Sequence, residues 1–366
     1  MRGPPLVFRF LISASRLLTP EIQGTEIMMA THSPNRSNHR AGFTLIELLV
    51  VIVIIGILTA FLLPAISGVR KNARIAQVRT EISSLESAIA SFKQKYGVDP
   101  PSQVSLYETN AGWTSDPDSR GKIRQIWPQF DFTATNRDFD LNGTVNQAVS
   151  GSGSSLVGKV TLSQGECLVF FLGGVLQRPE DANGNGLLDS GEDLNSDSKL
   201  GAVVSSGGTT LKPSCMGFSK NPLNPFALGG ARDTAVFEFD LSRLVDTNNN
   251  GYPEFVDPLP SQTNPYLYVS SYEGQGYRSN SASTTFEFAT AAQAAALPYP
   301  PTGPYLQSAT SPWKAKSFQI VSPGFDHNYG PFGVWTAETA ESVLTGATRQ
   351  YEVDNITNFH SGTLGR

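Results

Sequence analysis

Residues 40–63 read RAGFTLIELLVVIVIIGILTAFLL, and this stretch sets the architecture of the whole chain. From Phe43 to Leu63 it carries a single charged residue, Glu47. About 20 apolar helical residues are enough to cross the ~30 Å hydrocarbon core of a bilayer, whereas the apolar region of a secretory signal has only about 7–15 residues. The sequence therefore predicts a helix over residues 43–66 that inserts into a membrane. A helix buried in a protein core is the alternative.

Glu47 is the exception inside this apolar run. A carboxylate at the centre of a bilayer costs about 2.5–3.5 kcal/mol on insertion scales, so Glu47 is expected to have a partner there. The alternatives are a protonated carboxyl group or one that reaches the membrane interface. Glu47 also ends the sequence RAGFTLIE, residues 40–47, in which a glycine and a phenylalanine come directly before the apolar helix.

The sequence RAGFTLIE, followed by the apolar run, resembles the prepilin-type cleavage and methylation motif of type IV pilins and type II secretion pseudopilins. The resemblance implies that a membrane prepilin peptidase cleaves between Gly42 and Phe43, and that the new amino group of Phe43 is methylated. It also implies that Glu47 pairs with the Phe43 amine of a neighbouring subunit during filament assembly. Many members of the family carry a proline where this chain has Pro64, and such a residue is expected to bend the helix because it removes a backbone donor.

Residues 1–42 form the expected leader peptide. They carry five arginines and two acidic residues, whereas the whole chain has a net charge of −5, so a basic leader precedes an acidic body. This polarity is typical of a membrane-inserted chain, because positive flanks stay on the cytoplasmic side. The same overall charge gives no basic footprint for nucleic acid. Since 42 residues is long for such a leader, we expect translation to start at Met28 or Met29.

Beyond Pro64 the pattern becomes amphipathic. Apolar residues recur three and four positions apart, on one face of a helix: Ile75, Val78, Ile82, Leu85, Ile89, Phe92 and Tyr96. This spacing predicts a stalk helix over residues 67–98 that packs on its own globular domain, with a two-stranded coiled coil as the alternative. Gly97 and the prolines at 100–101 are expected to end it.

Residues 99–366 are predicted to form a globular head, which the family resemblance places in the periplasm. Short runs at 235–239, 266–269, 285–288 and 317–321 alternate as strands do, and the apolar segment 166–176 is long enough for a helix. The expected fold class is α+β, a pilin-like fold whose long N-terminal helix packs on an antiparallel β-sheet head with long calcium-loop insertions. The two cysteines, Cys167 and Cys215, are either bonded or free.

Segment 181–192 reads DANGNGLLDSGE and matches the twelve-residue calcium loop D-x-[DN]-x-[DN]-G-x5-E at every specified position. In such a loop, side-chain oxygens, one backbone carbonyl and a bidentate terminal Glu surround one cation, and the glycine makes the sharp turn. The predicted calcium ligands are Asp181, Asn183, Asn185, Leu187, Asp189 and Glu192. A cluster of turns without metal is the alternative.

Two further segments repeat the start of this motif. Segment 246–257 reads DTNNNGYPEFVD and ends in the shorter Asp. Its weaker candidate ligands are Asp246, Asn248, Asn250, Tyr252, Glu254 and Asp257. Segment 138–143 reads DFDLNG and has no terminal acid, so the sequence favours a simple turn there.

Two segments near the C-terminus, 322–330 and 354–358, resemble the C-terminal calcium-binding loop of the major, G-type pseudopilin. In that loop a Gly-x-Asp turn and a later Asp-Ile pair surround one ion. The resemblance implies Asp326 and Asp354 as ligands, with Asn355 as a lesser candidate. Turns without metal are again the alternative.

The chain contains no HExxH, GxSxG, Walker A or CxxC motif, so the sequence predicts a protein that is not an enzyme. The family resemblance implies a pseudopilin subunit of a type II secretion system, polymerised into a periplasmic pseudopilus for protein secretion. It would be a single-pass protein of the bacterial inner membrane, with its head in the periplasm and calcium in a structural role. Its expected partners are itself, other pseudopilins, the prepilin peptidase and the inner-membrane secretion platform. A type IV pilus subunit or a surface adhesin is the alternative.

Overall fold

The computed structural model of the chain describes residues 44–151, 157–182, 186–194, 196, 198–201, 204–206, 209–277 and 301–365. The chain divides into two compact units, residues 1–61 and residues 62–366, and each is described by itself. The second is called the head unit below. Several predicted features lie outside the described residues: the leader, Gly42, Phe43, Asn183, Asn185 and the run at 285–288.

Helix α1 (Leu45–Tyr96) begins with a capping box. The Glu47 carboxylate accepts hydrogen bonds from the backbone N–H and the hydroxyl of Thr44, both at 2.8 Å, and the Glu47 N–H donates to Thr44 Oγ1 at 3.3 Å. The helix assignment runs through Pro64 without a break. It ends before Gly97, whose φ of +81° suits a glycine and whose N–H donates to the Lys93 carbonyl.

The apolar stripe predicted on the second half of α1 is buried. Val78, Ile82, Leu85, Ile89 and Phe92 are at most 3% exposed and belong to the main core of the head unit. Polar contacts border this stripe, since the Tyr266 hydroxyl donates to Glu81 at 2.8 Å and the Asn358 amide donates to Glu86 at 3.0 Å. The interpretation that this segment packs on its own domain is therefore confirmed.

The first half of α1 has a different environment. Its apolar side chains from Leu45 to Phe61 are 46–82% exposed. Among the described residues, no helix combines the length and the apolarity needed to cross a membrane. The membrane-inserted helix over residues 43–66 stays a prediction.

The head unit continues with a two-stranded antiparallel sheet, in which β1 (Val104–Tyr107) pairs with β2 (Lys159–Leu162). Two short helices lie between these strands in sequence, α2 (Asn110–Ser115) and α3 (Pro117–Ile126). Proline is well placed at the start of α3, because the first helical N–H has no partner, and the Asp116 carboxylate caps this end by accepting from Ser119 N at 3.0 Å. Trp113 of α2 is fully buried in the main core.

Helix α4 (Gln164–Gly173) occupies the centre of the head unit, and all ten of its residues are buried. A helix that is apolar on all sides is stable only when surrounded, which explains why the sequence shows no polar face. Its first turn is fixed by a capping box between Ser163 and Glu166. The helix predicted at 166–176 is found at 164–173, so it begins two residues earlier and ends three residues earlier than predicted.

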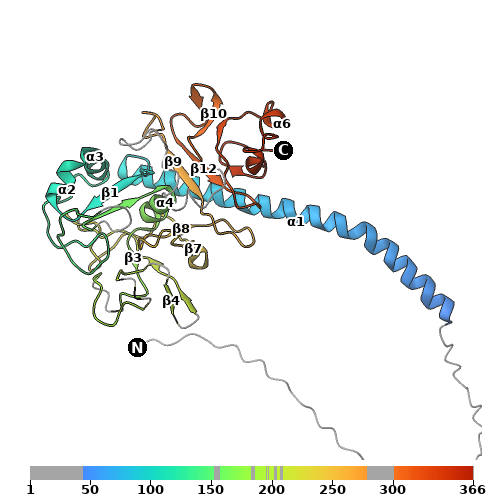
Figure 1. Ribbon diagram of the computed structural model, residues 1–366, viewed down its shortest axis with the longest axis horizontal. Helices are drawn as coiled ribbons and strands as arrows, with labels where there is room; N and C mark the ends of the chain where they lie inside the picture. Colours follow the sequence, from blue (N-terminus) through green and yellow to red (C-terminus); the bar gives the residue numbers. More distant parts are fainter. Residues whose placement is uncertain are drawn as a thin grey trace, which may run out of the picture. The chain divides into compact units, whose positions relative to one another are not determined.

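A three-stranded antiparallel sheet lies beside the second half of α1 in the head unit (Figure 1). Its strand order is β14 (Ile356–Thr357), β12 (Phe318–Ser322), β9 (Leu267–Ser270). Tyr268 and Ile320 belong to the main core, whereas Leu267 and Val321 belong to a second apolar cluster. Alternation therefore sends neighbouring side chains into two cores. The strands predicted at 266–269 and 317–321 are found one residue later, at 267–270 and 318–322, and every residue of β9 and β12 is buried.

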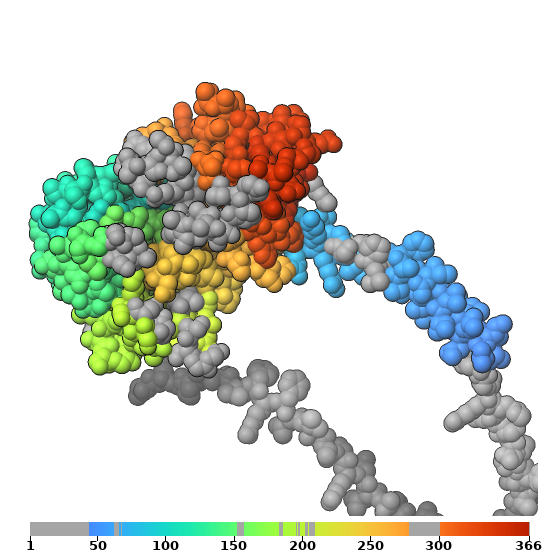
Figure 2. Space-filling view, viewed as in Figure 1, coloured from blue at the N-terminus to red at the C-terminus, as the bar shows by residue number. Residues whose placement is uncertain are grey.

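The remaining described strands form small sheets. They pair as β3 (Leu176–Gln177) with β6 (Ser214–Cys215), β4 (Val204–Ser206) with β5 (Thr209–Leu211), and β7 (Leu244–Val245) with β8 (Glu254–Phe255). Strand β10 (Tyr305–Ser308) lies between β11 (Ser311–Pro312) and β13 (Gly333–Val334). Short helical turns are η2 (Leu241–Arg243), α6 (Ala340–Val343) and η3 (Gln350–Glu352). In Figure 2, residues near 110–150 (teal to green) and residues beyond 300 (orange to red) form opposite sides of the head unit.

Two expectations about the head need correction. The head is a mixture of helices and small sheets, and β10 pairs with β13 in parallel, so a single antiparallel sheet is wrong for the described residues. The run 235–239 is not a strand. The N–H groups of Val236 and Phe237 both donate to the Leu172 carbonyl, at 2.7 and 3.1 Å, so this segment satisfies the end of α4 instead of pairing in a sheet. Cys167 and Cys215 are both free, which resolves the question of a disulfide.

Candidate functional site

The three segments with the calcium-loop pattern, all in the head unit, each form the same kind of backbone turn. We call residues 181–192 the first loop, 246–257 the second loop and 138–143 the third loop. In each, the leading Asp accepts a hydrogen bond from the glycine five residues later: 3.0 Å for Asp181 and Gly186, 2.9 Å for Asp246 and Gly251, and 2.7 Å for Asp138 and Gly143. These glycines have φ between +78° and +83°, a conformation that side chains with a Cβ disfavour. The shared pattern therefore produces a shared turn.

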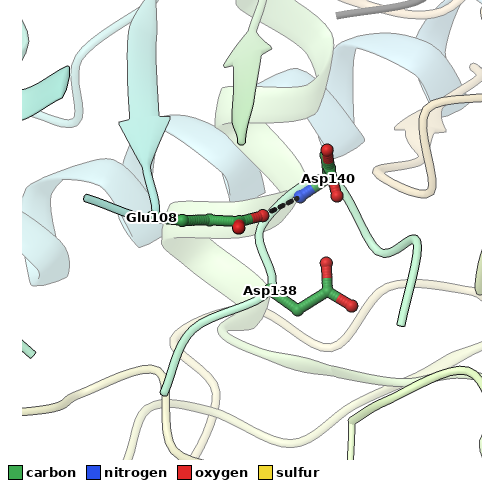
Figure 3. Close-up of side chains that lie close together, drawn as sticks. All are labelled: Glu108, Asp138 and Asp140. Atoms are coloured by element: carbon green, nitrogen blue, oxygen red, sulfur yellow. Dashed lines mark hydrogen bonds between the residues drawn. The ribbon is translucent and has the colours of Figure 1, made fainter. Parts of the chain in front are cut away.

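In the third loop the structure supplies the acid that the sequence lacks. Glu108 follows β1, and one of its carboxyl oxygens lies with one oxygen each of Asp138 and Asp140 within 4.8 Å of one another (Figure 3). Glu108 Oε1 accepts from the N–H groups of Phe139 and Asp140, at 3.1 and 3.4 Å. Burial raises the pKa values of Glu108 and Asp138 to about 7. The simple turn favoured by the sequence is thus part of a cluster of three carboxyl groups.

Two buried acids contact the first six residues of the second loop: Glu166 from helix α4 and Glu254 from later in the same loop. Glu166, in the first turn of α4, accepts from the side-chain amides of Asn248 and Asn250, at 2.9 and 2.6 Å. Glu254 accepts from the hydroxyl and the N–H of Thr247, at 2.6 and 3.1 Å. Burial raises the pKa of Glu166 to about 7 and that of Glu254 to about 8, and the charge of Glu166 contributes to the shift of Glu254.

The other candidate residues of the second loop have different surroundings. Burial raises the pKa of Asp246 to about 6, against the hydrogen bond from Gly251 and the nearby charge of Arg178. The Tyr252 hydroxyl donates to the Phe139 carbonyl at 3.1 Å, which ties the second loop to the third. Asp257 accepts from Leu259 N, from the Gln262 amide and from the Ser322 hydroxyl.

The first loop contains a buried carboxylate oxygen with no hydrogen-bond partner. Asp181 is 4% exposed; its Oδ2 accepts from Gly186, whereas its Oδ1 is unpaired. Glu192 reaches back across the loop and accepts from the N–H groups of Ala182 and Asp189, at 3.1 and 3.0 Å. An unpaired buried oxygen and a terminal Glu folded onto the loop suit a cation ligand set, so these residues fit calcium. Leu187 is half-buried, Asp189 is exposed, and both lie in the described part of the loop.

The two C-terminal segments also come together. Asp354 Oδ2 accepts from the N–H groups of Phe325 and Asp326, at 2.6 and 3.1 Å. Burial, followed by the charge of Asp354, raises the pKa of Asp326 to about 7. Asn355 is fully buried, and its amide donates to the Tyr305 hydroxyl and the Tyr329 carbonyl, while its Oδ1 is unpaired. The turn at Gly324 is tight, because a Cβ there would lie 2.5 Å from the Asp354 carbonyl.

Sequence reasoning missed Glu108 and Glu166. The segment Ser163 to Glu166 carries a capping-box signature, which marks Glu166 as a helix-start residue but gives no sign of its contact with the second loop. Glu108 has no comparable local signal. Both reach their loops only because the chain folds back on itself.

Comparisons with known proteins find a family motif that reaches into the start of α1, and relatives among secretion-system proteins and pilins. Residues 37–63 match the family model described as the prokaryotic N-terminal methylation motif. Type II secretion system core protein G of Vibrio cholerae is 37% identical over 67 residues, 18% of this chain and 46% of that protein. The corresponding protein of Klebsiella michiganensis is 33% identical over 25% of this chain and 68% of its own length, and a fimbrial protein of Neisseria meningitidis is 31% identical over 39% and 79%. No solved structure matches.

The class of protein follows from these findings: a structural subunit with an N-terminal methylation motif, not an enzyme. The chain belongs to the family of type IV pilins and type II secretion pseudopilins. It spans about half the length of the Vibrio cholerae relative. The relatives include secretion-system proteins and pilins, so the family alone does not separate the two.

Proposed function

We propose that this protein is a pseudopilin subunit of a type II secretion system, polymerised into a periplasmic pseudopilus that serves protein secretion. The observation that carries the proposal is the segment 37–63, a methylation motif followed directly by an apolar helix. In this function the chain is inserted in the inner membrane with its head in the periplasm. The prepilin peptidase cleaves between Gly42 and Phe43, and Phe43 becomes N-methylated.

The exposed apolar side chains of α1 support polymerisation. An apolar surface of this extent marks a membrane or protein contact in a soluble or membrane-anchored protein. The 46–82% exposure of the large apolar side chains from Leu45 to Phe61 is that of a single subunit. Membrane lipid before assembly and neighbouring subunits after assembly would cover them.

Glu47 would register each subunit on the next by pairing with the Phe43 amine of its neighbour. Among the described residues, its carboxylate accepts short-range hydrogen bonds from Thr44 alone, and it lies exposed at the start of α1. A charge in this position can therefore form an ion pair without first breaking a buried contact. The inner-membrane secretion platform and other pseudopilins are the remaining expected partners.

The C-terminal loop favours a secretion role over a pilus role. The resemblance of segments 322–330 and 354–358 to the G-type pseudopilin loop is supported by the contacts of Asp354 with Phe325 and Asp326. Relatives named type II secretion system core protein G point in the same direction. The second candidate, a type IV pilus subunit or adhesin, is favoured by the similarity to the fimbrial protein.

Calcium would act as a structural ion in this function. Asp181, Leu187, Asp189 and Glu192, with Asn183 and Asn185, would hold it in the first loop, and the unpaired Oδ1 of Asp181 supports this assignment. The weaker candidates Asp246 and Asp326 would be the first ligands of two further calcium sites, in the second loop and in the C-terminal loop. A bound cation would compensate carboxyl charges that burial otherwise penalises and would order long loops.

Deletion of the gene tests the function. If the protein is a pseudopilin, the deletion strain should retain secreted proteins in its periplasm and keep its surface pili, and the wild-type gene on a plasmid should restore secretion. Proteomics of the culture medium and the periplasm, with electron microscopy of the cell surface, measures both outcomes. Loss of surface pili with normal secretion would overturn the secretion role in favour of the pilus role.

A further inference from the structure

The head unit contains a cavity of about 240 Å³ whose wall includes two buried arginines, Arg137 and Arg178. They are 4% and 7% exposed. Residues of all three calcium-type loops also line this cavity, among them Asp138, Leu187 and Tyr252. The cavity thus lies where the three loops meet, inside one unit of the chain.

Both guanidinium groups have nitrogens without a partner. Nε and Nη1 of Arg137 and Nε of Arg178 are buried and make no hydrogen bond. Nη2 of Arg137 donates to the backbone carbonyl of Asp131, and Nη2 of Arg178 donates to that of Gly251. A buried charged donor without an acceptor is costly, and native structures pair nearly all such groups, so an acceptor from outside the chain is expected here.

The rest of the wall selects the kind of acceptor. Phe139, Phe170 and Phe226 contribute aromatic surface to the cavity. A strongly hydrated inorganic anion gains nothing from aromatic walls, whereas an organic acid can place its apolar body against them and its carboxylate at the guanidinium groups.

The charges nearby leave room for such a ligand. Asp138 is the acidic side chain on the wall, and its carboxyl oxygens accept from the N–H groups of Asn142 and Gly143. The Asp246 charge lies near Arg178 and the Asp131 charge near Arg137. None of these acids forms an ion pair with either arginine among the described residues, so the guanidinium nitrogens keep their capacity.

We propose that this cavity binds a small organic acid. The carboxylate meets the unpaired nitrogens of Arg137 and Arg178, and the apolar body lies against the phenylalanines. The site goes beyond the filament role and does not rest on it, because every residue that forms it lies between positions 136 and 252 of the head unit.

Calorimetric titration of the full chain in detergent, with millimolar calcium present throughout, tests the proposal. The probe is 3-phenylpropionate, and the controls are its neutral amide and inorganic phosphate. We expect the acid to bind at least about tenfold more tightly than the amide, because the amide lacks a charged acceptor. Equal affinity for acid and amide, phosphate that displaces the acid at equal concentration, or no binding at millimolar probe would each overturn the proposal.

Variants locate the binding. Arg178→Met should weaken binding of 3-phenylpropionate at least about tenfold, because it removes a charged donor. Leu228→Trp keeps both arginines and fills part of the cavity, so it should also weaken binding even if the methionine variant folds poorly. Arg124→Met, an exposed arginine away from the lining residues, is the matched control and should bind like the wild type. Unchanged binding in both cavity variants would overturn the site.

Discussion

Nδ2 of Asn250 donates a hydrogen bond of 2.6 Å to Oε1 of Glu166, and this contact joins the first turn of α4 to the second loop. Glu166 also closes the capping box with Ser163, whose N–H and hydroxyl both donate to Glu166 Oε2. One fully buried carboxyl group therefore holds a helix start and a loop that lie far apart in sequence. The loop is positioned by the core and not only by its own turn.

Replacing Glu166 should separate these roles. Glu166→Ala removes the helix cap and the acceptor for two amides, so we expect it to destabilise the protein by about 2–3 kcal/mol. Glu166→Gln can still cap the helix and should cost less in metal-free protein. Urea unfolding followed by circular dichroism measures both values; equal losses in the two variants would contradict the capping role.

The metal-free protein should lose stability as the pH rises from about 5 to about 8. Burial raises the pKa values of Glu166 to about 7 and of Glu254 to about 8 in the folded chain, whereas an unfolded Glu titrates near about 4.3. Between these values the folded state binds more protons than the unfolded state, so its stability falls with increasing pH. Urea unfolding in EDTA at several pH values measures the slope. The double variant Glu166→Gln, Glu254→Gln should reduce the slope and leave the part due to the other carboxyl groups whose pKa burial raises, among them Glu108, Asp138 and Asp326. An unchanged slope would contradict this origin.

Calcium should raise the melting temperature of the protein, and chelation should lower it, because a ligand that binds only the folded state stabilises it by mass action. Asp181→Asn should remove part of that response, since the unpaired Oδ1 belongs to this residue. Glu192→Ala should do the same. Differential scanning calorimetry with calcium or EDTA measures the shifts. Glu341→Gln, an exposed residue of α6, is the control and should respond as the wild type does. A melting temperature that does not respond to EDTA would show that the loops are only turns.

Glu47 variants should separate charge pairing from helix capping. Glu47→Gln keeps a side chain that can accept from Thr44 but removes the charge, and Glu47→Lys reverses it. We expect both to insert into the membrane and to fail in filament assembly. Thr44→Ala removes the hydroxyl that donates to the Glu47 carboxylate and accepts from the Glu47 N–H, but it keeps the Thr44 N–H and the Glu47 charge, so it should assemble. Membrane fractionation and electron microscopy of overproduced filaments measure these outcomes; normal filaments from Glu47→Lys would refute the pairing role.

Both cysteines should be alkylated after unfolding without any reductant, because both are free. In the folded protein we expect slow reaction, since burial raises the pKa of Cys215 to about 11 and keeps Cys167 protonated as well. Mass spectrometry after iodoacetamide treatment, in the presence and absence of urea, counts the modified thiols. Alkylation that requires a reductant would instead indicate a disulfide.

The sequence alone determined the features that depend on neighbouring residues. The spacing of Val78, Leu85 and Phe92 gave the buried face of α1, because a helix returns to the same side every three to four residues. The motif around Glu47 carried the family, and the aspartate–glycine spacing predicted the turn that all three loops share. The short strands β9 and β12 were also visible as alternating runs.

Only the tertiary structure decided which distant groups meet. Alternation at 235–239 resembles that of a strand, but the end of α4 offers the Leu172 carbonyl to this segment, and a helix end competes for the same N–H groups as a sheet. No local pattern predicts the partners of Glu108 or of the two cavity arginines, or the contact of Glu166 with the second loop. Their surroundings come from the burial of chain segments far apart in sequence, and burial is what turns ordinary carboxyl and guanidinium groups into groups that need a counter-charge.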